Sequence, residues 1–251
     1  MFQLFLLLLL NIGSLFLVGC QAVKPPESET VISPSPAVAP TPPKPSAEEV
    51  KAASEYRQLG LEYRSQKRYP EAIEALSKSV NLDPYNLSGG VIYGWTLHLA
   101  GKQPEAIAAL QKTLSLDPNH VPALNALGIV YLVSGNLPLA VETHHQAIKL
   151  KPANEIAHYN LSLAYHRLKN YDQGIIHGQE ATVLEADNPH PWVSLALIYW
   201  DKGDKSLAQQ TYQKAIALDG RYRERWFLDH LKEAGFTVEQ IDTVEAIRQY
   251  Q

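Results

Sequence analysis

The chain has 251 residues, of which 45% are hydrophobic, and it carries a formal net charge of −4. This apolar content is typical of a protein that buries a core, and the lack of a basic excess argues against nucleic acid as a partner. The single cysteine, Cys20, excludes an internal disulfide and a two-cysteine zinc site.

The first segment is an apolar run over residues 2–18 that ends in Leu17-Val18-Gly19-Cys20. Its length is typical of the core of an export signal. The four residues resemble the lipobox of bacterial lipoproteins, in which the cysteine thiol receives a diacylglycerol (palmitate-type) lipid before cleavage. The resemblance predicts a lipoprotein signal peptide over 1–19 and a lipidated Cys20, although no Lys or Arg precedes the apolar core. The alternative is an uncleaved anchor with an incidental cysteine, and both place the protein at a membrane.

The segment that follows, 20–46, is predicted to be a disordered linker. It holds eight of the 17 prolines of the chain, and such segments favour extended conformations that could reach about 80 Å. A proline-rich ligand for another domain is the alternative. Gln21 stands where Asp would indicate inner-membrane retention, so we expect a cell-envelope protein at the outer membrane, facing the periplasm, rather than one at the inner membrane.

A repeat of 34 residues organises the rest of the chain. The sequence Leu82-Asp83-Pro84 returns as Leu116-Asp117-Pro118 and again as Leu150-Lys151-Pro152. Five units align without a gap over 53–86, 87–120, 121–154, 155–188 and 189–222. Because a fixed period of this length is the signature of a solenoid, we expect each unit to bury its apolar face against its neighbours.

The columns of this alignment alternate small and large residues. One small column reads Gly60, Gly94, Gly128, Ser162, Ala196, and another reads Ala72, Ala106, Ala140, Gly174, Ala208. This pattern resembles the tetratricopeptide repeat (TPR) family, in which two helices of each unit cross closely at the small residues. The resemblance implies an all-α, right-handed superhelical solenoid of about five TPR helix pairs over 47–222.

The expected start of each second helix is marked by a column of prolines, Pro70, Pro104 and Pro138, which suit a first helical turn. Asp172 and Ser206 occupy the same column in the last two units and are predicted to cap those helices.

The residues after the repeats, 223–251, are predicted to form a C-terminal helical cap over the last unit. Tyr222, Trp226 and Leu231 lie at helical spacings before Gly235, and Trp226 is expected to be a packing residue. A second short helix is expected behind Thr237 as its N-cap.

The resemblance also implies where partners bind, because the first helices of TPR units line a concave groove. The expected protein-binding residues there are mostly apolar and aromatic: Val91, Trp95, His98, Asn125, Ile129, Leu132, Tyr159, Asn160, Leu163, His166, Arg167, Val193, Leu197 and Trp200. The same face is also expected to carry Ser54, Arg57, Gln58, Leu61, Arg64, Ile92, Leu99, Val133 and His190. Such a wall is a large apolar surface of the kind that marks partner sites. Alternatively, the superhelix is tight enough for these residues to touch, or the linker or the C-terminal helix covers them.

The expected ligand is an apolar protein or peptide segment. The carboxylate clamp of chaperone-binding TPR proteins matches poorly here, since Leu61, Ile92, Pro122 and Ala126 fill its other columns beside Arg57. Asn125 and Asn160 could still hold the backbone of a bound peptide through their side-chain amides.

We expect no catalytic residue, no metal and no cofactor. The nine histidines are the only candidates; His144 and His177 could form part of a metal site, but no carboxylate completes it. No phosphate-binding or hydrolase motif is present. The sequence therefore predicts a membrane-anchored scaffold or adaptor, acting in envelope, pilus or secretion assembly. A self-associating structural protein and a non-catalytic activator of an envelope enzyme are the alternatives, and the oligomeric state is left open.

Overall fold

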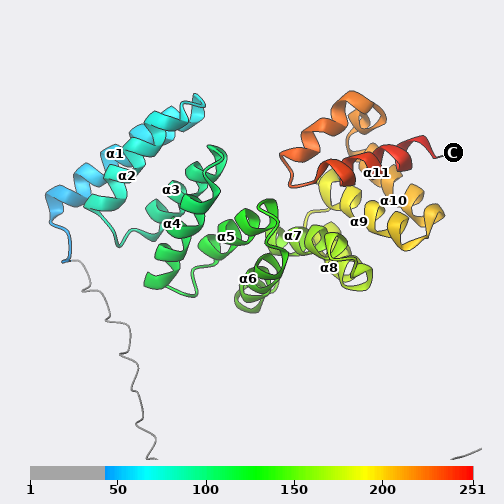
Figure 1. The fold of residues 1–251 in the computed structure, drawn as a ribbon, viewed down its shortest axis with the longest axis horizontal. Helices are drawn as coiled ribbons and strands as arrows, with labels where there is room; N and C mark the ends of the chain where they lie inside the picture. The colour runs from blue at the N-terminus through cyan, green and yellow to red at the C-terminus, as the bar shows by residue number, and fades with distance from the viewer. Residues whose placement is uncertain (1–42, 251) are drawn as a thin grey trace, which may run out of the picture. The chain divides into compact units, whose positions relative to one another are not determined.

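The computed structural model describes residues 43–250, and all the secondary structure in that range is helical. Figure 1 shows the α-helices following one another as pairs, with a C-terminal segment that ends in α11. The helices are α1 (Ala47–Ser65), α2 (Tyr69–Leu82), α3 (Leu87–Leu99), α4 (Gln103–Leu116), α5 (Val121–Val133), α6 (Leu137–Leu150), α7 (Glu155–Arg167), α8 (Tyr171–Leu184), α9 (Pro189–Lys202), α10 (Lys205–Leu218) and α11 (Val238–Gln249). The predicted all-α solenoid of about five helix pairs is confirmed.

The second helices begin as their sequences suggest, with one correction. Proline lies in the first turn of α2, α4 and α6, where its missing amide proton costs no hydrogen bond. The prediction that Asp172 and Ser206 cap α8 and α10 is wrong. The caps are Asn170 and Asp204, two residues earlier, whose side chains accept from the backbone N–H groups of Gln173 and Leu207.

The turn inside each pair uses a left-handed residue at one fixed column. Positive φ angles occur at Lys67, Gly101, Gly135, Lys169 and Gly203, which are spaced by 34 residues. Glycine adopts this conformation without steric cost, and the two lysines accept some strain. The same turn therefore closes all five pairs.

The glycine column lets the two helices of a pair approach closely. A Cβ atom added to Gly94 would lie 2.6 Å from Cγ of Leu110, and one added to Gly128 would lie 2.5 Å from Cε1 of His144. These distances are far below van der Waals contact, so a large side chain of the second helix occupies the space that the glycine leaves.

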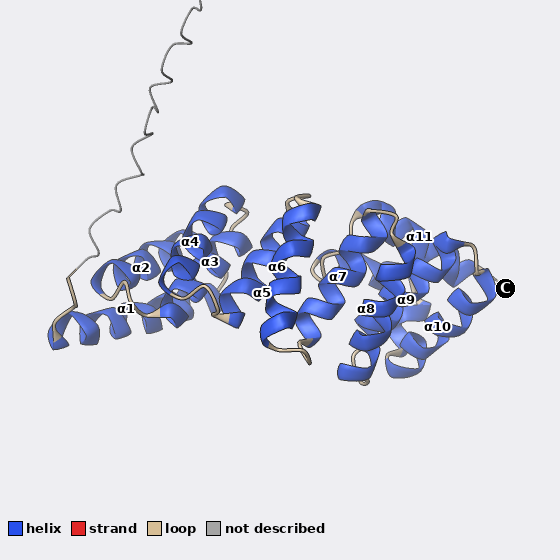
Figure 2. Ribbon diagram, turned by 90° about the horizontal axis from the view of Figure 1, so that it is seen from below, coloured by secondary structure: helices blue, strands red, loops and turns tan. Residues whose placement is uncertain are grey.

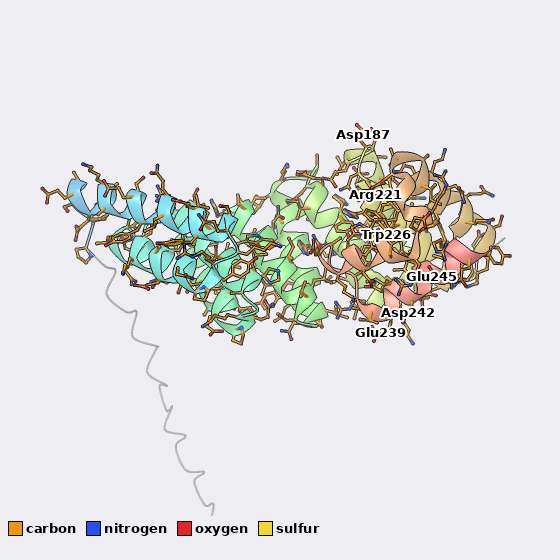
Figure 3. The ribbon with its side chains drawn as sticks, turned by 90° about the horizontal axis from the view of Figure 1, so that it is seen from above. Asp187, Arg221, Trp226, Glu239, Asp242 and Glu245 are labelled. Carbon is orange, nitrogen blue, oxygen red and sulfur yellow. The ribbon has the colours of Figure 1, made fainter. Side chains whose placement is uncertain are left out.

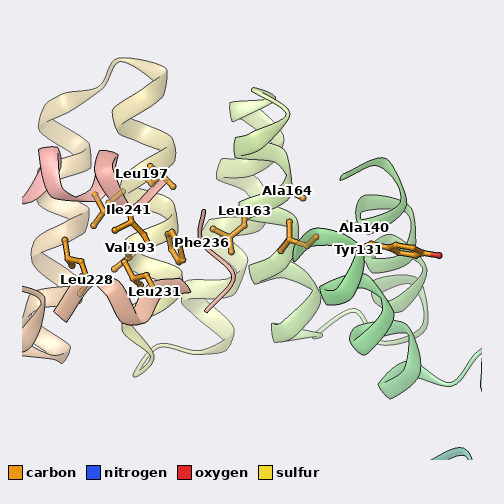
Figure 4. Close-up of a cluster of buried hydrophobic side chains, with 14 of the residues drawn as sticks. Tyr131, Ala140, Leu163, Ala164, Val193, Leu197, Leu228, Leu231, Phe236 and Ile241 are labelled. Atoms are coloured by element: carbon orange, nitrogen blue, oxygen red, sulfur yellow. The ribbon is translucent and has the colours of Figure 1, made fainter. Parts of the chain in front are cut away.

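The C-terminal segment returns over the last repeats. Two 3₁₀ helices, η1 (Gly220–Arg223) and η2 (Arg225–Lys232), precede α11, whose N-cap Thr237 forms a capping box with Gln240. Phe236 belongs to the same buried cluster as Leu163 of α7 and Val193 of α9 (Figure 4). The segment is thus part of the main core.

Trp226 corrects a prediction. The sequence predicts that this residue packs in the core. In the structure its side chain is 68% exposed, and its ring contacts Phe227 edge-on. Figure 3 labels it at the C-terminal end of the protein, together with the exposed carboxylates Glu239 and Asp242. The apolar side of η2 is provided by Leu228 and Leu231 instead, because a 3₁₀ helix repeats every three residues.

Helices and loops of residues 43–250 are distinguished in Figure 2. None of the helices in this range is both long and apolar enough to cross a bilayer. The predicted signal peptide, the lipidated Cys20 and most of the predicted linker lie outside the described residues.

Candidate protein-binding groove

The first helices of pairs two to four line an apolar cavity. Trp95 and Leu99 of α3, Ile129 and Val133 of α5, and Ile156 of α7 contribute to its wall. The cavity has a volume of about 620 Å³, within the range of sites that bind ligands. Leu99, Val133 and Ile156 are 40%, 45% and 38% exposed. We call these five side chains the open groove.

A second cavity continues the open groove. It has a volume of about 500 Å³ and shares Trp95, Ile129 and Ile156 with the first. Val121 and Pro122 at the start of α5 extend its wall. The three shared side chains therefore form the centre of one longer apolar surface.

Charged residues of both signs border this surface. Lys67, Glu185, Lys232 and Glu233 lie around the first cavity, while Lys151 and Glu155 of the second form an ion pair of 3.0 Å. The rim thus has no single sign of charge, and an apolar centre with a mixed polar rim is the usual composition of a protein interface.

The C-terminal half of the predicted groove is covered by the chain itself. Leu132, Leu163, Val193 and Leu197 are fully buried in the cluster that also contains Phe236. A Cβ atom on Gly235 would lie 3.6 Å from Leu163 and 3.9 Å from Leu132. These four side chains are therefore part of the core and do not face an open surface.

Tyr159 marks the boundary between the open and the covered part. Tyr159 lines the first cavity, and its hydroxyl donates a 2.6 Å hydrogen bond to the carbonyl oxygen of Ala234. Burial raises the pKa of the Tyr159 hydroxyl well above its usual value, so it stays protonated and acts as a donor.

Two other predicted groove residues, His166 and Arg167, also form hydrogen bonds within the domain. Nε2 of His166 lies 2.8 Å from a carboxylate oxygen of Asp201, and its Nδ1 lies 2.9 Å from the amide nitrogen of Gln240 in α11. Arg167 donates a 2.6 Å hydrogen bond to the carbonyl oxygen of Leu132. Both side chains hold neighbouring helices together.

Trp200 is covered in a similar way. The ammonium group of Lys205 lies 3.7 Å from the centre of its ring, and Tyr250 packs edge-on against it. A cation over an indole face is an attractive contact. Trp200 is thus partly buried against its own chain.

The asparagines expected to hold a peptide backbone already form hydrogen bonds within the chain. Asn125 and Asn154 exchange two side-chain hydrogen bonds of 3.2 and 2.9 Å, and Asn160 donates to the carbonyl oxygen of Ile156. His98 pairs with Gln103 at 2.8 Å, while Val91 packs at the edge of the main core. The side chains that remain open are the apolar ones.

Sequence reasoning missed several contributors to this site, of which two are informative. Ile156 shares its repeat column with Pro122, and both line the second cavity, so inspection of that whole column would have found it. The turn Lys232–Gly235 forms one wall of the first cavity, but it lies outside the repeat and carries no periodic signal.

Histidines gather elsewhere, on α6, α7 and α8. Nδ1 of His177 lies 3.1 Å from Nδ1 of His158, and the His145 ring packs edge-on against His177. His144 is fully buried, and neither ring nitrogen has a hydrogen-bond partner among the residues that the structure describes. Burial lowers the pKa of His144 to about 3 and that of His177 to about 4. Within residues 43–250, no group of three His, Cys, Asp or Glu side chains is arranged to hold a metal ion.

Solved structures of other proteins share the fold of the repeats. A MamA crystal structure is 24% identical, covering 68% of this chain and 93% of MamA, with a TM-score of 0.59. MamA from Desulfovibrio magneticus RS-1 is 24% identical over 67% of this chain and 95% of its own, with a TM-score of 0.61. TTC0263, a thermophilic TPR protein of Thermus thermophilus, is 20% identical over 68% and 93%, with a TM-score of 0.57. A comparison with curated proteins found no match.

Sequence profiles identify the repeats themselves. Three profiles described as tetratricopeptide repeat match residues 53–86, 100–143 and 189–222, and one described as TPR repeat matches residues 131–169. Together they cover more than half of the chain and fall on the helix pairs described above. The chain therefore belongs to the tetratricopeptide repeat family.

Proposed function

We propose that this protein is a lipid-anchored adaptor that binds an apolar segment of a partner protein in the open groove. The observation that supports it best is the continuous apolar surface around Trp95, Ile129 and Ile156, bordered by charges. TPR proteins bind protein partners, and an apolar helix or strand that enters such a groove buries its side chains against these three.

The site extends over fewer repeats than the sequence suggests. Since residues 232–236 fill the groove beside α7 and α9, a partner segment would lie along α3, α5 and the first half of α7. The turn Lys232–Gly235 would then contact one end of the segment. The chain's own C-terminal residues thus limit the length of the bound segment.

The membrane part of the proposal rests on the sequence. The apolar run that ends at Cys20, followed by a proline-rich segment, would tether the repeats to the cell envelope and hold them away from the bilayer. A partner would be another envelope protein, such as a component of pilus or secretion assembly, and the outer membrane is the favoured site.

Substitution in the open groove tests the binding function. The full chain would be used to capture partners from envelope extract, in its natural form and as the Trp95→Ala, Ile129→Ala double variant. Trp226→Ala is the matched control, because this tryptophan is exposed and lines neither cavity. A protein captured by the natural chain and by the control, but lost from a double variant with unchanged circular dichroism, supports the groove. Equal capture by all three would refute it.

Labelling with a radioactive fatty acid tests the anchor separately. The natural chain is expected to incorporate the label in its bacterial host, and Cys20→Ser is expected to incorporate none while still being made. If Cys20→Ser is labelled equally, or if the natural chain is not labelled, the lipid-anchor proposal is wrong.

A further inference from the structure

A smaller cavity lies between the first two repeats, away from the open groove. It has a volume of about 120 Å³ and is surrounded by α2, α3, α4 and the turn between α2 and α3. Its apolar wall includes Val80, Leu87, Gly90, Tyr93, Ala109 and Leu116. It shares no lining residue with the two cavities of the groove.

The repeat alignment explains why this space is empty. Gly90 stands in a column that holds Tyr56, Leu124, His158 and Trp192 in the other four units. Only the second repeat lacks a large side chain there. The cavity is therefore at the place where the other repeats put a side chain of their own.

The third repeat shows what fits such a space. Leu124 is 2% exposed and packs against Ala147, Ala157 and Leu114. One repeat earlier, Thr113 corresponds to Ala147 and Val80 corresponds to Leu114, and both line the cavity. Two of the three neighbours of Leu124 thus have counterparts that line the cavity beside Gly90, where the leucine is missing.

The chain cannot fill this space from position 90 while Thr113 is present. A Cβ atom on Gly90 would lie 2.3 Å from Oγ1 of Thr113, far below van der Waals contact. That hydroxyl is held in place, because it donates a 3.0 Å hydrogen bond to the carbonyl oxygen of Ala109. Thr113 and Gly90 together keep the pocket open.

We propose that this pocket receives a single aliphatic or aromatic side chain, of leucine or phenylalanine size, from a segment of a partner protein. Its volume is close to that of cavities of about 150 Å³ that bind benzene. Ser77, Asn81 and Lys112 contribute polar side chains to the same site, which can pair with the backbone of the incoming segment. The pocket is an anchor point independent of the groove.

Binding of small amide probes tests the proposal directly. Methyl resonances of Val80, Leu87 and Leu116 in the full chain would be followed by NMR with N-acetyl-leucinamide, N-acetyl-phenylalaninamide and N-acetyl-glycinamide. Saturable shifts in the millimolar range are expected with the first two and none with the glycine compound. The absence of saturable shifts with both large side chains would overturn the proposal. Shifts with toluene alone would also overturn it and indicate a site for a free apolar molecule.

A filled variant provides the matched control. Gly90→Leu combined with Thr113→Ala rebuilds the Leu124 and Ala147 pair of the third repeat, so we expect it to fold, to melt at a higher temperature and to bind neither probe. Thr113→Ala alone leaves the pocket open and is expected to bind both. If the filled variant fails to fold, Ala109→Leu fills the same space from α4. Undiminished binding by a folded, filled variant would disprove the assignment.

Discussion

The hydroxyl of Tyr159 donates a 2.6 Å hydrogen bond to the carbonyl oxygen of Ala234, across 75 residues of sequence. The bond joins the fourth helix pair to the C-terminal segment at the point where the open groove ends. Arg167 and His166 add further contacts on the same helix, to Leu132 and to Gln240 of α11. The groove is therefore closed at one end by a segment that the repeats themselves hold.

Removal of this hydroxyl is expected to weaken the fold. Tyr159→Phe leaves the Ala234 carbonyl oxygen without its donor, so we expect a loss of about 1 to 2 kcal/mol in the free energy of unfolding. Urea denaturation followed by circular dichroism measures it. Tyr171→Phe is the control, because that hydroxyl forms no hydrogen bond with any residue of 43–250, and it should change stability by less than about 0.5 kcal/mol. Equal effects of the two substitutions would contradict the role given to the bond.

Much of the fold follows from periodicity alone. The small residues of the columns that begin with Gly60 and Ala72 recur because the two helices of every pair must approach equally closely. One sequence therefore shows the same packing requirement five times. The helix pairs and their order could therefore be predicted.

The extent of the groove could not be predicted in this way. Leu163, Val193 and Leu197 occupy groove columns, yet they are buried because a segment without repeats lies over them. Where Phe236 and Gly235 come to lie depends on tertiary packing that occurs once in the chain. The sequence left open whether the groove is covered. In the structure, the N-terminal half of the groove is open and the C-terminal half is covered.

Close packing at the glycine column predicts opposite effects for two glycines of α3. A Cβ atom on Gly94 would overlap Leu110 at 2.6 Å, whereas one on Gly89 would meet its nearest neighbour, Asn86, at an ordinary 3.4 Å. Gly94→Ala should therefore lower the free energy of unfolding by about 1 to 3 kcal/mol. Gly89→Ala should leave it unchanged or raise it by up to about 1 kcal/mol, because alanine favours helix. Thermal melts of the two variants and of the natural chain measure these changes in stability. A clear loss of stability in Gly89→Ala would contradict the prediction.

The buried histidines predict that acid weakens the fold. Both His144 and His177 have ordinary pKa values of 6.5 that fall on folding, to about 3 and about 4. Above pH 6.5 they are neutral in both states. As the pH falls from 6.5 towards 4, the unfolded chain gains protons that the folded chain does not, so stability decreases by up to about 1.4 kcal/mol per pH unit for each histidine. Urea midpoints measured from pH 7.5 to 4.5 should decline over this window.

A substitution taken from the neighbouring repeats separates this effect from the titration of carboxylates. His144 shares its column with Leu76 and Leu110, which pack against Gly60 and Gly94 as His144 packs against Gly128. His144→Leu removes two unpaired buried nitrogens and should stabilise the fold at pH 7.5 by about 1 to 3 kcal/mol. It should also make the pH dependence shallower. An unchanged slope below pH 6.5 would show that His144 does not titrate as described.

The C-terminal segment offers a last pair of matched substitutions. Phe236 is 4% exposed in the main core, beside Leu163 and Val193, while Trp226 is 68% exposed ten residues earlier. Phe236→Ala would leave a cavity between the segment and α7, so we expect it to cost about 3 to 5 kcal/mol, against less than about 0.5 kcal/mol for Trp226→Ala. If the segment is an integral part of the fold, Phe236→Ala should shift the urea transition of the whole domain as one cooperative step. A separate early transition, with the remaining helices unaffected, would instead mean that the segment detaches and exposes the covered half of the groove.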